Sequence, residues 1–222
     1  MYYFKNGNLH NYLAKEFKNL KWKNKIGILL DIINGLKEIH EQNIIHHNLH
    51  SGNIFQHGYY STYVADLRLS ISADKSSTSN ENNIYGVLPY VVPEVLNGEP
   101  YTMASDVYSF GVLMSLVSTG QQTFYNIAHD ANLAFKICEG VRPVFSTNTP
   151  KFYIELAYKC MSASLNECPT AEEIEKVIRT WTDALFCTIN DLKNFWKWIR
   201  LNLILQLSLQ LYIQMLFILV DY

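Results

Sequence analysis

The feature that most constrains the fold is the stretch of residues 106–117, which is rich in large apolar residues throughout. This pattern predicts a helix that is buried on most sides, so other elements must surround it. The chain has 222 residues, of which 49% are hydrophobic and 17% are charged. That length is enough for one sizeable core and too short for two comfortable domains. We therefore expect one globular core that contains this helix.

Four further segments carry helical signals. Residues 24–41 place Ile and Leu side chains at a spacing that gives one apolar face, which predicts a long helix. Further helices are expected at residues 132–139 and 152–161. The last helix is expected to start at Thr170, because Thr170 and Glu173 have the spacing of a capping box. The sequence thus predicts a mainly α domain.

Two shorter segments complete the predicted secondary structure. Residues 63–65 (Tyr-Val-Ala) resemble a strand that enters a loop. Residues 72–83 are dominated by Ser, Thr, Asn, Asp and Glu. Such a composition cannot bury apolar area, so a mobile surface loop is expected there.

Charge and cysteine content exclude several classes of function. The formal net charge is −2 and no face is obviously basic, so no nucleic-acid partner is expected. The cysteines form no CxxC pair, which favours reduced thiols over a metal site; they are Cys138, Cys160, Cys168 and Cys187. The N-terminus lacks the apolar run of a signal peptide, so a cytoplasmic protein is expected.

Five short motifs follow one another in the order found in protein kinases. Residues 46–53 (HHNLHSGN) resemble the catalytic loop H-R-D-L-x-x-x-N, and residues 66–68 (DLR) resemble the D-F-G motif. Residues 86–94 (GVLPYVVPE) resemble the end of an activation segment. Residues 105–111 (SDVYSFG) resemble the D-V-[WY]-S-[FY]-G helix, and residues 140–143 (GVRP) resemble the G-x-R-P motif. Together they mark a resemblance to the tyrosine-kinase-like serine/threonine branch of the protein-kinase family.

The resemblance covers roughly residues 1–181 and implies a particular part of the kinase fold. Residues 2–13 resemble the hinge and the first helix of the C-terminal lobe. No segment resembles the Gly-rich loop or the strand lysine that precede the hinge in the family. The expected fold is a kinase-like C-terminal lobe without its small lobe, over residues 1–182. Residues 183–222 are expected to form a basic-aromatic linker and an apolar C-terminal segment.

The catalytic position of the family is changed in this chain. Asn48 stands where the resemblance places the catalytic aspartate, which accepts the proton of the substrate hydroxyl. An amide can form hydrogen bonds, but it cannot take up that proton. A positioned general base contributes about 10²–10⁴-fold to the rate. The chain as given is therefore predicted to be inactive.

The resemblance implies ATP and Mg²⁺ as cofactors and assigns residues to them. Tyr2, Tyr3 and Phe4 match the hinge that contacts the nucleotide, and Asn53 and Asp66 match the two metal ligands. Hard oxygen ligands suit Mg²⁺. The alternative is that Asn53 and Asp66, both in polar loops, only satisfy local backbone groups.

Other family positions differ as well. Arg68 stands where the family has a glycine, and His47 replaces an arginine that pairs with phosphate. The buried arginine that pairs with Glu94 in the family is replaced by Cys168, which predicts that Glu94 is either solvated or protonated. Asp106, which in the family ties the buried helix to the catalytic-loop backbone, is kept.

The C-terminal segment is compatible with a membrane. Residues 193–200 are basic and aromatic, and residues 201–220 contain no charge. As a helix, these twenty residues would span about 30 Å, enough to cross a bilayer core. Because a polar residue recurs every four positions, an interfacial helix or a helix that packs on a partner fits equally well. A third alternative is that this segment is not native to the protein.

Three functions are compatible with these observations. The preferred hypothesis is a truncated pseudokinase that acts as a binding module for an unidentified protein. The first alternative is an ATP-dependent serine/threonine kinase whose small lobe lies outside this chain. The second is a membrane-tethered interaction protein.

Overall fold

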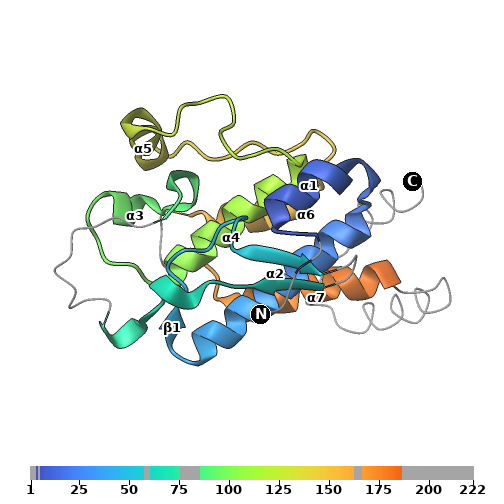
Figure 1. Ribbon diagram of the computed structural model, residues 1–222, viewed down its shortest axis with the longest axis horizontal. Helices are drawn as coiled ribbons and strands as arrows, with labels where there is room; N and C mark the ends of the chain where they lie inside the picture. The colour runs from blue at the N-terminus through green and yellow to red at the C-terminus, as the bar shows by residue number, and fades with distance from the viewer. Residues whose placement is uncertain (1–3, 5, 58–60, 76–85, 163–166, 187–222) are drawn as a thin grey trace, which may run out of the picture.

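The computed structural model describes residues 4, 6–57, 61–75, 86–162 and 167–186 (Figure 1). Its α-helices are α1 (Leu9–Glu16), α2 (Trp22–Glu41), α3 (Pro93–Leu96), α4 (Met103–Thr119), α5 (Ala131–Cys138), α6 (Lys151–Cys160) and α7 (Ala171–Phe186). The strands are β1 (Ile44–Ile45), β2 (Ile54–His57), β3 (Ser61–Val64) and β4 (Ile71–Ser72). Short 3-10 turns include η1 (Phe17–Asn19), η2 (Leu67–Leu69), η3 (Ala73–Lys75) and η4 (Leu88–Tyr90). The mainly helical prediction is confirmed.

The predicted helices appear within three residues of their expected limits, as α2, α4, α5 and α6. Both hydrogen bonds of the capping box that predicts the start of α7 are present. The backbone N–H of Glu173 donates to the Thr170 hydroxyl at 3.2 Å, and the backbone N–H of Thr170 donates to the Glu173 carboxylate at 2.7 Å. Local sequence signals therefore suffice for the helices.

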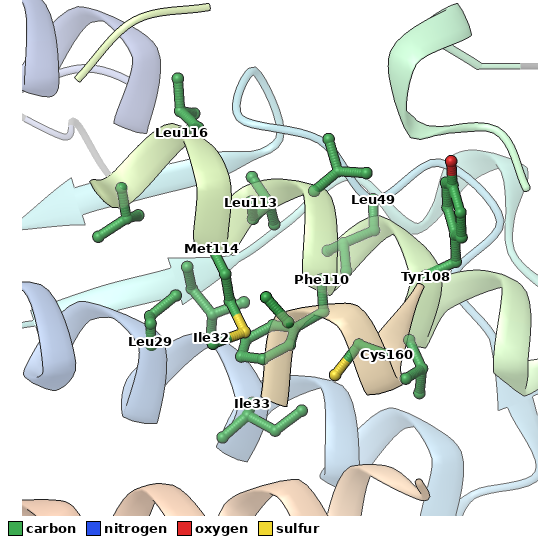
Figure 2. Packing of buried hydrophobic residues seen from close by; sticks show 14 of the residues in the cluster. Leu29, Ile32, Ile33, Leu49, Tyr108, Phe110, Leu113, Met114, Leu116 and Cys160 are labelled. Carbon is green, nitrogen blue, oxygen red and sulfur yellow. The ribbon is translucent and has the colours of Figure 1, made fainter. Parts of the chain in front are cut away.

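Helix α4 forms the centre of the core, as its composition predicts. All its residues from Ser105 to Ser118 are buried, and it packs against α2 and α6 (Figure 2). Gly111 allows the close approach to α6, since an added Cβ would lie 2.7 Å from the Met161 side chain and 3.0 Å from a backbone oxygen of α6. Helix α7 covers the other side of α2.

Two small antiparallel pairs lie beside this helical core. β2 pairs with β3, with Ile54 opposite Val64, and the hairpin lies against α2. β1 pairs with β4, with Ile44 opposite Ser72. The predicted strand at residues 63–65 corresponds to β3, which begins two residues earlier and ends at Val64.

The prediction of a mobile loop is wrong for its first four residues. Ser72 belongs to β4, and residues 73–75 form η3. The Ala73 N–H donates to the Asn43 carbonyl at 2.9 Å, and the Asn43 amide donates to the Asp74 carboxylate at 2.9 Å. The partners are about thirty positions earlier in the chain, so local composition could not reveal them. Residues 76–85 lie outside the described part.

The C-terminal predictions fall largely outside the described residues. Helix α7 continues through the expected boundary at residue 182 and is described as far as Phe186. Within the described ranges, no helix combines the length and the apolar character needed to cross a bilayer. Residues 201–220 are not described, so the membrane segment stays a prediction.

A buried lysine joins α2 to the end of α4. Lys25 is 8% exposed, and its Nζ donates to the Ser118 carbonyl at 3.2 Å. The same Nζ lies 4.0 Å from the centre of the Phe17 ring. A cation near a helix C-terminus is favourable, but burial disfavours its charge and lowers the pKa of Lys25 to about 8.

This lowered pKa predicts a pH trend in stability. Between pH 8 and 10.5 the unfolded chain binds the Lys25 proton more tightly than the folded chain does, so stability should rise with pH across this window. Relative to Lys25→Met, the wild-type free energy of unfolding should increase by about 1 kcal/mol from pH 7.5 to pH 9.5, after a discount for solvent screening. Urea denaturation of both proteins at the two pH values measures this increase in the free energy of unfolding.

The control is Lys23→Met, which removes a lysine from an exposed position of the same helix. A difference between wild type and Lys25→Met that stays constant with pH would contradict the assigned pKa.

Candidate functional site

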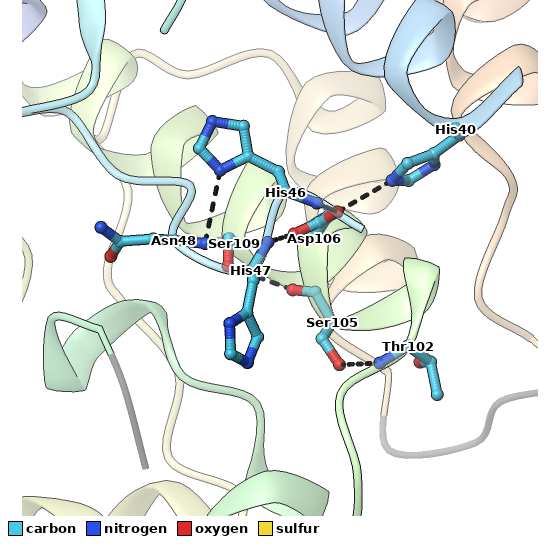
Figure 3. A network of polar contacts seen from close by, with 8 residues as sticks. All are labelled: His40, His46, His47, Asn48, Thr102, Ser105, Asp106 and Ser109. Atoms are coloured by element: carbon cyan, nitrogen blue, oxygen red, sulfur yellow. Dashed lines mark hydrogen bonds and ion pairs between the residues drawn. The ribbon is translucent and has the colours of Figure 1, made fainter. Parts of the chain in front are cut away.

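The site is built around the carboxylate of Asp106 in α4, which is 2% exposed. Its Oδ2 accepts hydrogen bonds from the His46 N–H at 2.8 Å and from the His40 ring at 2.9 Å. Its Oδ1 accepts from the His47 N–H at 3.0 Å (Figure 3). The expectation that Asp106 ties α4 to the catalytic-loop backbone is confirmed.

The His46 ring fixes the next part of the loop. Its Nδ1 accepts from the Asn48 N–H at 3.3 Å, so Nε2 carries the proton and donates to the Ala65 carbonyl at 3.0 Å. This ring is completely buried. It therefore joins the loop around Asn48 to the chain segment that leads into Asp66.

Asn48 lies where the resemblance predicts the catalytic position. Its backbone carbonyl accepts from the Asn53 side-chain amide at 2.9 Å, which closes the loop on itself. Its side-chain oxygen faces Gly86, where an added Cβ would lie 3.7 Å away. The loop that presents residue 48 is thus formed, while the residue itself is an amide.

The two predicted metal positions lie beside each other. The backbone carbonyl of Asn53 accepts from the Ala65 N–H at 2.9 Å, directly before Asp66. Asp66 adopts a left-handed backbone with φ of 69°, which few residues other than glycine take up readily. The fold therefore places the side chains of Asn53 and Asp66 on adjacent segments.

The carboxylate of Asp66 is already paired. The Arg68 guanidinium donates from Nε to Oδ1 at 2.6 Å and from Nη2 to Oδ2 at 2.9 Å. The hydrogen bond to Arg68 is the main cause that holds the pKa of Asp66 at about 2. Because the fork takes one lone pair of each oxygen and places a positive charge beside them, it opposes the binding of a divalent cation on that side of the carboxylate.

The hinge prediction is only partly within the described residues. Tyr2 and Tyr3 lie outside them. Phe4 lies against the β2–β3 hairpin, with its ring centre 5.2 Å from that of Phe55 and 5.7 Å from that of Tyr63. The exposed fraction of Tyr63 is 48%. An aromatic surface therefore lies next to the hinge position.

His47, which replaces the phosphate-pairing arginine of the family, makes local contacts. Its Nδ1 lies 3.0 Å from the Leu69 carbonyl, and its ring packs edge-on against Tyr101, with 3.8 Å between ring centres. Burial is the main cause that lowers its pKa, so the ring is neutral at pH 7. His47, Asn48, Tyr90 and Tyr101 line a hollow with about 10 Å³ of free volume, which holds about one water molecule.

Glu94 has lost the partner expected from the family. Its Oε2 is buried, and no hydrogen-bond partner for it occurs among the described residues. The solvated alternative is therefore wrong for this oxygen. Cys168 is half-buried, and its pKa is raised to about 11, first by burial and then by the nearby charge of Glu94.

Sequence reasoning missed two features of this site. It gave His40 no role toward Asp106, and it did not foresee that Arg68 would pair with Asp66. His40 lies 66 positions before Asp106, so no local signal links them. Arg68 is two positions from Asp66, and that proximity of opposite charges was the available signal.

An arginine at position 168 should repair the site of Glu94. A buried acceptor without a partner costs about 1–3 kcal/mol. Cys168→Arg is therefore expected to raise the free energy of unfolding by about 1 kcal/mol or more, as measured by urea denaturation. In the Glu94→Gln background this gain should disappear, and a gain of equal size there would refute the pairing.

Asp106→Asn should destabilise the fold without changing the shape of the side chain. The substitution replaces one acceptor oxygen by an NH2 group, which then faces a buried N–H donor, and it removes the charge from all three hydrogen bonds. We expect a loss of about 2–4 kcal/mol in the free energy of unfolding. Asp183→Asn, on an exposed position of α7, is the matched control and should change it by less than about 0.5 kcal/mol.

Comparison with known proteins agrees with this geometry. The family model for protein tyrosine and serine/threonine kinases matches residues 1–178. A protein named as a serine/threonine-protein kinase/receptor of Acanthamoeba polyphaga mimivirus is 27% identical over 183 residues, which cover 82% of this chain and 11% of that protein.

Two relatives from Dictyostelium discoideum, both named as serine/threonine-protein kinases, are similar to a comparable extent. One is 31% identical over 158 residues, covering 71% of this chain and 10% of the relative. The other, drkA, is 29% identical over 173 residues, covering 77% of this chain and 26% of the relative. The chain spans about a quarter or less of the length of these curated relatives.

The match extends over most of the chain, and the loop, the buried helix and the Asp106 contacts have the expected arrangement. This chain belongs to the protein tyrosine and serine/threonine kinase family.

Proposed function

We propose that this chain is a catalytically inactive member of the kinase family that acts as a binding module. The observation that carries the proposal is the identity of residue 48. The loop around it has its hydrogen bonds to His46 and Asn53, so the side chain at this position is presented as the fold requires. That side chain is an amide and cannot accept the proton of a substrate hydroxyl.

The same site lacks other elements of phosphoryl transfer. Family members use ATP with Mg²⁺, and the metal ions neutralise charge that develops on the phosphates. Here the Asp66 carboxylate is engaged by Arg68. This pairing favours binding over catalysis.

A binding role is also supported by the surface of the lobe. Phe135 on α5 is 71% exposed and Val144 is 73% exposed, although both are large apolar side chains. Exposed apolar side chains of this size can supply contact area for a protein partner. The rigid core around α4 can hold such a surface without any catalytic activity.

The rival is an active serine/threonine kinase completed by a small lobe outside this chain. The adjacent positions of Asn53 and Asp66 favour it, because both metal-ligand positions of the family are kept. Asn48 opposes it, since loss of the general base alone costs about 10²–10⁴-fold in rate.

Transfer of the γ-phosphate from Mg²⁺-ATP to a pool of Ser/Thr peptides tests the proposal. The wild-type chain should give no more transfer than Asp66→Ala, because the base is absent. Asn48→Asp should raise transfer by about 10²–10⁴-fold if the remaining scaffold is competent. Transfer by the wild type clearly above the Asp66→Ala level would reject an inactive protein.

The binding role has its own readout. A tagged Asn48→Ala/Asp66→Ala double variant should co-purify with the same proteins as the wild type, and in equal amounts. Loss of these proteins from the double variant would show that binding depends on the catalytic positions.

A further inference from the structure

The contact between Asp66 and Arg68 is a two-point ion pair at the position expected for a metal ion. The guanidinium donates to each carboxylate oxygen, at 2.6 Å and 2.9 Å. This fork geometry is the strongest arrangement that a single basic side chain can form with a carboxylate. The Asp66 side chain is 22% exposed and that of Arg68 is 87% exposed, so the pair lies at the open edge of the site.

Backbone hydrogen bonds fix the turn that carries Arg68. Residues Leu67–Leu69 form the turn η2, in which the Ser70 N–H and hydroxyl both donate to the Leu67 carbonyl, at 3.1 Å and 2.7 Å. The Leu69 carbonyl contacts the His47 ring, and β4 follows directly. Arg68 is not among the described residues with positive φ, so this turn does not need the glycine of the family.

A metal ion and the guanidinium are both cations that compete for the same carboxylate. Mg²⁺ and Mn²⁺ bind carboxylate oxygens, and both oxygens of Asp66 accept from Arg68. We infer that Arg68 is an internal counter-cation that occupies the divalent-metal position, so that a metal ion reaches Asp66 only after the guanidinium has left. The inference goes beyond the proposed function, because it concerns cation binding and holds whether or not phosphate is transferred.

Competition of this kind changes the apparent affinity by a predictable factor. A ligand that binds only the open form has an apparent Kd equal to the intrinsic Kd divided by the fraction of open protein. Arg68 is exposed and can leave the carboxylate without unfolding, so the open form is accessible. A pair that is closed about nine-tenths of the time weakens metal binding about tenfold.

The experiment is a titration of the full 222-residue chain with Mn²⁺, followed by the electron paramagnetic resonance signal of the free ion. Arg68→Gln removes the charge and the fork, and it should tighten Mn²⁺ binding about tenfold. Arg68→Lys keeps the charge without the fork and should give a smaller gain. Circular dichroism checks that each variant is folded as the wild type is.

Two further variants separate this inference from a general charge effect. Arg179→Gln removes an arginine that pairs with Glu175 on α7, and it should leave the Kd for Mn²⁺ within about twofold of wild type. Asp66→Asn/Arg68→Gln should abolish the gain, because the metal ligand is gone.

The inference is overturned if Arg68→Gln binds Mn²⁺ no more tightly than the wild type. It is equally overturned if the gain persists without the Asp66 carboxylate, or if Arg179→Gln produces the same gain. The phosphate-transfer assay does not enter this test, so failure here leaves the assignment of Asn48 untouched.

Discussion

The Asp106 carboxylate is the contact on which the rest of the site depends. It is almost completely buried, and it accepts hydrogen bonds from two successive backbone N–H groups and from the His40 ring. A buried charge is stable only when it is hydrogen-bonded on this scale. The contact therefore joins three segments that are far apart in the chain: the central helix α4, the catalytic loop and the end of α2.

The shape of the loop that Asp106 holds does not depend on the chemistry of the side chain at position 48. The bonds that shape the loop run between the Asp106 carboxylate, backbone groups and the His46 ring, and none of them needs an aspartate at position 48. A kinase-family loop can therefore keep its form with an amide at position 48. The shape of the loop and the chemistry at position 48 are therefore separable, because the contacts that shape the loop do not involve that side chain.

The partners of two carboxylates near this loop differ from those that the family resemblance predicts. Glu94 has lost an arginine, and its Oε2 is buried without a hydrogen-bond partner in the described part of the chain. Asp66 has gained one, since Arg68 takes up both of its oxygens. The first change leaves a buried acceptor near Cys168. The second places the Arg68 guanidinium on the carboxylate that the resemblance assigns to a metal ion.

The sequence alone determined the longer helices, the order of the motifs and the place of Asn48, whereas the link from Asp106 to the loop was expected only from the resemblance to the family. The first three follow from local periodicity, capping residues such as Thr170 and short-range motif spacing, which act within one segment. Only the tertiary structure decided the pairing of β1 with β4, the contact of His40 with Asp106 and the closure of Asp66 by Arg68. The first two join residues about thirty and sixty-six positions apart, so their partners are set by how the helices pack. The third joins close neighbours, but whether they meet depends on the left-handed backbone of Asp66 and the turn that follows, which composition does not reveal.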